Sequence, residues 1–215
     1  MISFSVAYTA EWASTRVGVP FGQYYYTEDT RQQELFISNI PLMDTLSFTF
    51  LSYVSFTLAL LFEGRRLGHR KERRDPLKER TCARVLILGT IFFVLIDVVI
   101  DPLAVRGDRW FLGRIFGYQY PGFYFGVPFS NFIGWGIVGG ITFFLIQRID
   151  RWLVEAGRSN PPFPRGDIRD YLGPGLYYGV LLFNLSVTFW IGEIFLGLAG
   201  VLLFLPVTFF LARRY

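Results

Sequence analysis

The sequence predicts an all-α fold: a single integral-membrane domain, residues 1–215, built as a polytopic bundle of about six transmembrane helices. Two observations predict it. Of the 215 residues, 52% are hydrophobic and only 18% are charged, which is unusual for a soluble domain. The charged residues also gather in blocks, leaving charge-free windows at 45–62, 115–147, 171–192 and 194–212. About six spans of roughly 20 residues would use most of the chain, so no second soluble domain is expected.

The spans follow in order along the chain. A hydropathy window of about 19 residues places five of them at about 40–62, 82–100, 127–148, 175–192 and 194–212. The first segment, residues 1–15, is apolar but short. It is expected to be a truncated span, a half-embedded helix, or a span whose true start lies upstream of Met1. A signal peptide is not expected, because Glu11 and Trp12 stand where small residues should precede cleavage.

Lys and Arg are distributed unevenly between the loops. Sixteen of the 21 lie in residues 63–84, in 148–170 and in the C-terminal tail, which alternate with the other loops. Because cytoplasmic loops are enriched in Lys and Arg, these segments are predicted to face the cytoplasm of a cell (plasma) membrane, together with both termini. The same asymmetry accounts for the net charge of +4. Membrane lipid is therefore a predicted partner, and nucleic acid is not.

Five acidic residues lie within apolar segments or at their ends: Glu11, Asp44, Asp97, Asp101 and Glu193. An ionisable residue in an apolar span is costly, so it normally faces the bundle interior and serves a site. Under the predicted topology, all five lie toward the non-cytoplasmic ends of their helices. A functional role is favoured most for Glu11, which precedes the first basic residue, and for Asp97, which follows a charge-free run of twelve residues.

Structural roles stay open for the other three acids. Asp101 precedes Pro102, where the helix is expected to fray, and it could cap a turn or pair with Arg106 or Arg109. Asp44 lies in the first turn of its helix, where the helix dipole favours a carboxylate. Glu193 could simply mark the water boundary between the last two helices.

Residues 5–62 and 85–148 share a weak pattern. Each has an acid near the outer end of a helix, an aromatic and Gly-rich loop, and then a helix that opens Pro-x-x-Asp from Pro41 or Pro-x-x-Asn from Pro128. The pattern indicates a parallel repeat about an axis along the membrane normal, followed by a helical hairpin at 175–212. Chance similarity is the alternative.

The loops within this pattern are strongly aromatic. Residues 18–27 and 117–129 alternate Gly with Tyr and Phe. One interpretation is an aromatic belt at the membrane interface. The other is a pair of re-entrant loops on the non-cytoplasmic side, in which Gly lets the backbone approach closely and the rings line a groove for a long apolar or cationic guest.

A pair of small residues stands in the span at 127–148. Gly136 and Gly140 are four residues apart and are expected to form a helix-packing face.

Buried carboxyl groups among aromatic rings predict acid chemistry. A neutral carboxylic acid in an apolar site is a proton donor. Protonating a terminal trisubstituted double bond of a membrane-soluble polyene gives a tertiary carbocation, which aromatic faces stabilise. The cation then loses a proton, closes a ring or captures water. No cofactor is predicted, since the chemistry needs none and the sequence has no His/Cys cluster, phosphate-binding loop or dinucleotide fingerprint.

Several segments of residues 5–140 resemble a known family: EWASTRVGVPFGQYYYT, IPLMDTLSF, the pattern DxxxDPxA from Asp97 to Ala104, and YFGVPFSNFxGW from Tyr124 to Trp135. They are similar to the integral-membrane carotenoid biosynthesis proteins, which include enzymes of the γ-carotene 1′-hydratase and bisanhydrobacterioruberin hydratase types. The resemblance implies addition of water across the C1,C2 double bond of an acyclic carotenoid ψ end group. Family members usually continue further toward the amino terminus than this chain.

The candidate site residues follow from the acids, the rings and the resemblance. The resemblance implies Glu11, Asp97 and Asp101 as the catalytic acids and Asn131 as their polar partner. We hypothesise that Asp97 or Asp101 donates the proton, that the other or Glu11 deprotonates the attacking water, and that Asn131 holds this water. The candidates for binding the carotenoid are Trp12, Phe21, Tyr26, Asp44, Tyr124, Phe125 and Trp135.

Two other functions stay open. A small membrane carotenoid (lycopene) cyclase would begin with the same protonation but would end in ring closure. A carotenoid-binding or transport protein would use the acids as hydrogen-bonding partners or as a proton relay.

Overall fold

The protein is all-α, as the sequence predicts. The computed structural model describes residues 1–27, 29–67, 75–109, 113–158 and 169–213. In these ranges the helices are α1 (Ile2–Val17), α2 (Leu42–Leu67), α3 (Pro76–Arg80), α4 (Ala83–Ala104), α5 (Phe129–Glu155), α6 (Arg169–Trp190) and α7 (Ile194–Ala212). The central parts of the two basic segments, residues 68–74 and 159–168, lie outside the described residues.

Five helices match the predicted spans. Within the described residues, α2, α4, α5, α6 and α7 are long and apolar enough to cross a membrane. The last one coincides with the charge-free window at 194–212. Helix α4 continues beyond its predicted end, through Pro102 to Ala104. The expectation that this helix frays before Pro102 is therefore wrong, and Asp101 lies inside helical structure.

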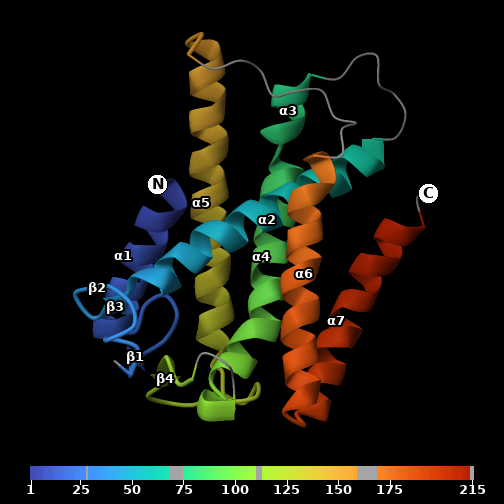
Figure 1. Cartoon of the computed structure of the whole chain (residues 1–215). Helices are drawn as coiled ribbons and strands as arrows, with labels where there is room; N and C mark the ends of the chain where they lie inside the picture. Colours follow the sequence, from blue (N-terminus) through green and yellow to red (C-terminus); the bar gives the residue numbers. More distant parts are fainter. Residues whose placement is uncertain (28, 68–74, 110–112, 159–168, 214–215) are drawn as a thin grey trace.

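Helix α1 is shorter than a bilayer span. Its 16 residues correspond to about 24 Å, against about 30 Å for the hydrocarbon core. The helix ends at Gly18, whose left-handed φ of 75° is a conformation that glycine adopts without strain and whose N–H bonds to the carbonyl of Ser14. In Figure 1, α1 covers only part of the length of its neighbour α5, on the side where the strands lie.

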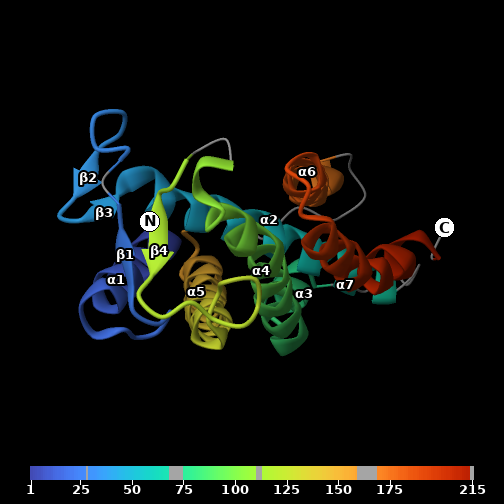
Figure 2. The ribbon, with the colours of Figure 1, turned by 90° about the horizontal axis from the view of Figure 1, so that it is seen from below.

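The long helices are arranged around α2. Helix α2 runs diagonally across the bundle (Figure 1), and α1, α5 and α4 stand in a row along it when the molecule is seen from below (Figure 2). Farther along the chain, α6 packs on α2 and α4, and α7 packs on α4 and α6. A hydrogen bond from the buried Tyr177 hydroxyl to the carbonyl of Phe92, 2.8 Å long, ties α6 to α4.

The loops at one end of the bundle form short strands, and we call this end the strand end. Strand β1 (Tyr24–Tyr26) pairs antiparallel with β4 (Phe116–Tyr118), so Tyr24 lies opposite Tyr118. Strand β2 (Phe36–Ile37) pairs with β3 (Ile40–Pro41). A 3-10 turn, η2 (Gly107–Arg109), and the connection between α6 and α7 lie at the same end (Figure 1). The two aromatic loops thus come together. That residues 5–62 and 85–148 form a repeat remains a prediction.

Basic residues with ion-pair partners mark the opposite end, where α3 lies. Arg80 pairs with Asp150, and Arg84 lies 3.7 Å from the buried Glu63. The described parts of residues 63–84 and 148–158 that form these pairs thus lie at the end opposite the strands. Which end faces the cytoplasm stays a prediction.

Helix α5 makes its close contacts through glycines other than the predicted pair. A methyl group on Gly134 would lie 2.9 Å from the backbone of Pro20 and 2.5 Å from the ring of Phe21. One on Gly140 would meet nothing within 4 Å in the described residues, and one on Gly136 only Val94 at 3.8 Å. The expected packing face at Gly136 and Gly140 is therefore wrong, because among the described residues no helix approaches closely at either position.

These contacts predict that Gly134→Ala lowers the free energy of unfolding by about 1–3 kcal/mol, as overpacking a closed contact does. Gly140→Ala is the matched control in the same helix; it should be neutral or slightly stabilising, since Ala favours helix. Thermal unfolding of both variants in detergent measures the difference. Equal unfolding temperatures would contradict the packing described here.

Candidate active site

Two carboxyl groups meet near the strand end of α4. Asp97 and Asp101 are four residues apart and share one face of the helix. The side-chain amide of Asn131, in the first turn of α5, donates to Oδ2 of Asp97 at 2.9 Å and to Oδ2 of Asp101 at 2.8 Å. Tyr118 of β4 donates its hydroxyl to Asp101 Oδ2 at 3.0 Å. All four side chains are buried, and we call them the α4 acid cluster.

One carboxyl oxygen of this cluster lacks a hydrogen-bond partner among the described residues. This oxygen is Oδ1 of Asp97, and it is buried. A buried carboxyl oxygen without a donor is unfavourable for a carboxylate. A neutral carboxylic acid is less costly there, because it carries no charge.

A second group of acids lies across from the first. Glu11 of α1 is fully buried, and Thr45 of α2 donates to its Oε2. The hydroxyl of Tyr26, on β1, lies 3.2 Å from Glu11 Oε1 and also contacts Oδ2 of the half-buried Asp44. We call Glu11, Tyr26, Asp44 and Thr45 the α1–α2 acid cluster. Tyr24 extends it, because its hydroxyl lies 3.3 Å from that of Tyr26.

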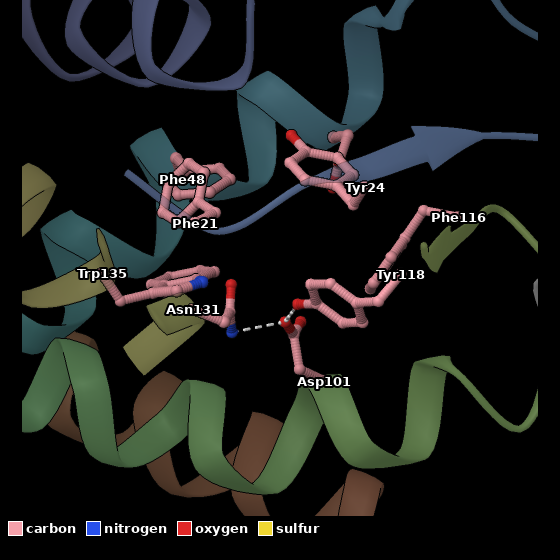
Figure 3. Close-up of a pocket in the computed structure, with 9 residues that line it drawn as sticks. Phe21, Tyr24, Phe48, Asp101, Phe116, Tyr118, Asn131 and Trp135 are labelled. Atoms are coloured by element: carbon pink, nitrogen blue, oxygen red, sulfur yellow. Dashed lines mark hydrogen bonds between the residues drawn. The ribbon is translucent and has the colours of Figure 1, made fainter. Parts of the chain in front are cut away.

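A small cavity separates the two clusters. Its volume is about 40 Å³, which is enough for a water molecule. One carboxyl group of each cluster faces it: Asp44 from α2 and Asp101 from α4. Figure 3 shows Asn131 and Tyr118 converging on Asp101 at the cavity edge. The other lining residues are Phe21, Tyr24, Phe48, Phe116, Tyr118, Asn131 and Trp135.

Aromatic rings form most of the remaining wall. Trp135 stacks on Phe48 with ring centroids 4.3 Å apart and planes 16° from parallel, and Phe21 lies against both rings. Figure 3 places these three rings on one side of the cavity and Tyr24, Phe116 and Tyr118 on the other. Aromatic faces carry negative potential, so such a wall attracts a cation without offering it a nucleophile.

The tyrosines that connect the carboxyl groups stay neutral. Burial raises the pKa of the Tyr24, Tyr26 and Tyr118 hydroxyls well above the usual value of a phenol, and the charges of nearby carboxyl groups raise it further. These hydroxyls therefore keep their hydrogen. Tyr26 and Tyr118 act as donors to carboxyl groups, and the Tyr24 hydroxyl pairs with that of Tyr26.

The structure brings together most of the residues that the sequence predicts. Phe21, Asp44, Asp101, Asn131 and Trp135 line the cavity. Tyr26 and Asp97 lie behind the wall, each hydrogen-bonded to a residue that lines it. Glu11 lies one step farther back, where it accepts from Tyr26.

Three predicted residues lie elsewhere. Trp12 is 46% exposed, and Arg16 stacks on its ring. Tyr124 and Phe125 pack on each other, and Tyr124 also contacts Phe132; none of these residues lines the cavity.

Four lining residues escaped the sequence analysis: Tyr24, Phe48, Phe116 and Tyr118. Tyr24 is the first residue of β1, and Phe116 and Tyr118 are the first and third residues of β4, on the same face of that strand. A period of two within residues 24–26 and 116–118 is the signal that could have pointed to them.

Glu193 belongs to a separate structural contact. It pairs with Arg106 at 3.1 Å and with Arg109 at 2.8 Å. Arg106 also donates to the carbonyl of Phe125 at 2.9 Å. The expectation that Asp101 pairs with one of these arginines is therefore wrong, because both form ion pairs with Glu193. These ion pairs tie the α6–α7 connection to the loop after α4.

The fold and site define a class: a polytopic helical protein in which buried carboxyl groups and aromatic rings surround one small cavity. In the described residues, no group of His, Cys, Asp and Glu is arranged to hold a metal ion. The model of the family described as "Carotenoid biosynthesis protein" matches residues 1–203. The chain therefore belongs to this carotenoid biosynthesis family, which confirms the resemblance seen in the sequence.

One relative of the chain has a named activity. The bisanhydrobacterioruberin hydratase of Haloarcula japonica is 28% identical over 198 residues, which are 91% of this chain and 57% of the relative. The chain thus spans little more than half the length of that protein. No solved structure matches this chain.

The hydrogen bonds of Asn131 predict its contribution to stability. Asn131→Leu removes the shared donor of two buried carboxyl groups and should cost about 1–3 kcal/mol of unfolding free energy. Asn184→Leu is the control. Asn184 is also buried, in α6, but within the described residues its amide donates to a single group, the carbonyl of Val180 in its own helix, at 2.9 Å. Thermal unfolding in detergent should therefore show the larger loss for Asn131→Leu. The reverse order would contradict this assignment.

Proposed function

We propose that this protein is a cofactor-independent hydratase, which adds water across the C1,C2 double bond of an acyclic carotenoid ψ end group. The observation that carries the proposal is the cavity, where Asp44 and Asp101 face one space walled by aromatic rings. Membership of the carotenoid biosynthesis family and a hydratase among its relatives support the substrate and the reaction.

The first step is protonation of the double bond. Asp101 faces the cavity, and the fully buried Asp97 stands behind it. Two carboxyl groups joined through Asn131 are stable when they share a proton, because two adjacent negative charges repel each other. Asp101 gives this proton to C2, the π bond breaks, and C1 becomes a tertiary cation. Asp97 replenishes the proton on Asp101.

The aromatic wall stabilises the cation. Phe48 and Trp135 present their rings to the cavity as a stacked pair beside Phe21. Each favourable cation–π contact contributes about 0.5–2 kcal/mol. The cavity is small, so the lining side chains move apart when the end of the polyene enters.

Water then captures the cation. Both amide hydrogens of Asn131 are used by Asp97 and Asp101, which leaves its oxygen to accept a hydrogen bond from water. Figure 3 shows this oxygen on the side away from Asp101. Attack of the water oxygen on C1 forms the C–O bond, and loss of one water proton gives the tertiary 1-hydroxyl.

Expression of the chain in a lycopene-producing bacterium tests the proposed reaction. A pigment heavier by one water per reacted end supports a hydratase. A new pigment with the mass of lycopene would instead identify a cyclase. Unmodified lycopene that co-purifies with the protein would identify a carotenoid-binding or transport protein.

Substitution of the α4 acids tests the proton donor. General acid catalysis contributes about 100-fold or more, so Asp97→Asn and Asp101→Asn should each lower hydration by at least this factor. Asp150→Asn is the control, because Asp150 pairs with Arg80 at the opposite end of α5; it should keep full activity. Full hydration by either α4 variant, inserted in the membrane and folded, would exclude that residue as the donor.

A further inference from the structure

We infer that Asp44 is the base that takes the proton from the attacking water, with Tyr26 and Glu11 as the relay behind it. This inference rests on the proposed hydration. It divides the site into a proton donor, the α4 acid cluster, and a proton acceptor, the α1–α2 acid cluster.

The two clusters have the same layout around the cavity. Each offers one carboxyl group to the wall, Asp101 on one side and Asp44 on the other. Each also holds a second carboxyl group behind the wall, and both of these, Asp97 and Glu11, are fully buried. Hydration requires one group that gives a proton and another that accepts one. One carboxyl group from each cluster faces the cavity and can take one of these roles.

The connecting side chains distinguish the two roles. Asn131 has two amide hydrogens and donates one to each acid of the α4 cluster. Tyr26 has a single hydroxyl hydrogen and contacts both Glu11 and Asp44. It can donate to only one of them at a time. While Tyr26 donates to Glu11, a proton that arrives at Asp44 can pass to the Tyr26 oxygen as Tyr26 gives its own hydrogen to Glu11, in a single concerted shift without a charged phenolate.

The exposure of the acids assigns the direction. Asp97 is fully buried and Asp101 is 8% exposed, whereas Asp44 is only half-buried. The α4 cluster is therefore the more enclosed of the two. We assign the donor to the enclosed cluster and the acceptor to the cluster that lies nearer the surface.

The protons balance over one reaction. Asp101 loses a proton to C2, and the water oxygen bonds to C1. The resulting oxonium loses one proton to the Asp44 carboxylate, which leaves the neutral alcohol. The enzyme has then moved one proton from the α4 cluster to the α1–α2 cluster. Solvent takes it from Asp44, and water that enters after product release returns one to the α4 cluster, in which Asp97 and Asp101 share it.

Deuterium separates the two clusters in an experiment. The solubilised full chain is given lycopene in D₂O, and both the hydrated product and the label in unhydrated pigment are measured by mass. Asp44→Asn should lose hydration by about 100-fold or more while unhydrated pigment still gains deuterium, since the cation forms and then loses a proton. Asp101→Asn should lose both. Asp150→Asn is again the control and should match the wild type.

Tyr26→Phe tests the relay without removing a carboxyl group. Hydration should fall, but by less than in Asp44→Asn, while deuterium still enters unhydrated pigment at the wild-type rate. Tyr25→Phe is the matched control in the same strand, because Tyr25 is 44% exposed and its hydroxyl contacts Arg114 instead. It should leave both readouts unchanged.

The outcomes separate this inference from the proposed hydration. A wild-type chain that yields neither the heavier product nor deuterium in lycopene would overturn the proposed function itself. A wild-type chain that hydrates lycopene, while folded Asp44→Asn either keeps full hydration or loses deuterium uptake as well, would overturn the assignment of Asp44. Wild-type partitioning of products in Tyr26→Phe would overturn the relay.

Discussion

The need of buried carboxyl groups for hydrogen-bond donors is the constraint on which this structure depends. Carboxyl groups among apolar helices are costly unless they are paired or bonded. For Asp97 and Asp101 the shared donor is Asn131 on α5. Glu11 and Asp44 both contact the hydroxyl of Tyr26 on β1, which donates to one of them at a time. Each donor comes from a different element than the acids that it serves. The hydrogen bonds that make the acids tolerable therefore also fix how the elements meet.

The β1–β4 pair turns two separate clusters into one site. Tyr24 lies opposite Tyr118 in this short ladder, and their ring centroids are 6.1 Å apart. One tyrosine reaches the α1–α2 acid cluster through Tyr26, and the other donates directly to Asp101. Backbone pairing of two loops thus sets the separation across which the acids face each other, with a single cavity between them.

The sequence predicted the helices and the acids because both are local signals. An apolar window long enough to cross a membrane identifies a span such as α7 without any other part of the chain, and a carboxyl group within such a window stands out alone. The rings are different. Glu11 is fully buried while its neighbour Trp12 is 46% exposed, since consecutive residues point about 100° apart on a helix. Tyr118 faces the cavity only because β4 pairs with β1, a contact that no local pattern contains.

Protonation alone does not decide what a carotenoid cation becomes. A hydratase and a cyclase share the first step, so the difference lies in what stands opposite the proton donor. An aromatic wall alone would stabilise the cation until another double bond of the same carotenoid molecule attacked it and closed a ring. A carboxyl group at that place holds water by a hydrogen bond and accepts its proton, which makes capture by water faster than ring closure. Asp44, facing the cavity with Tyr26 and Glu11 behind it, is such a group. Under the proposed hydration, the α1–α2 acid cluster is therefore what would select the alcohol.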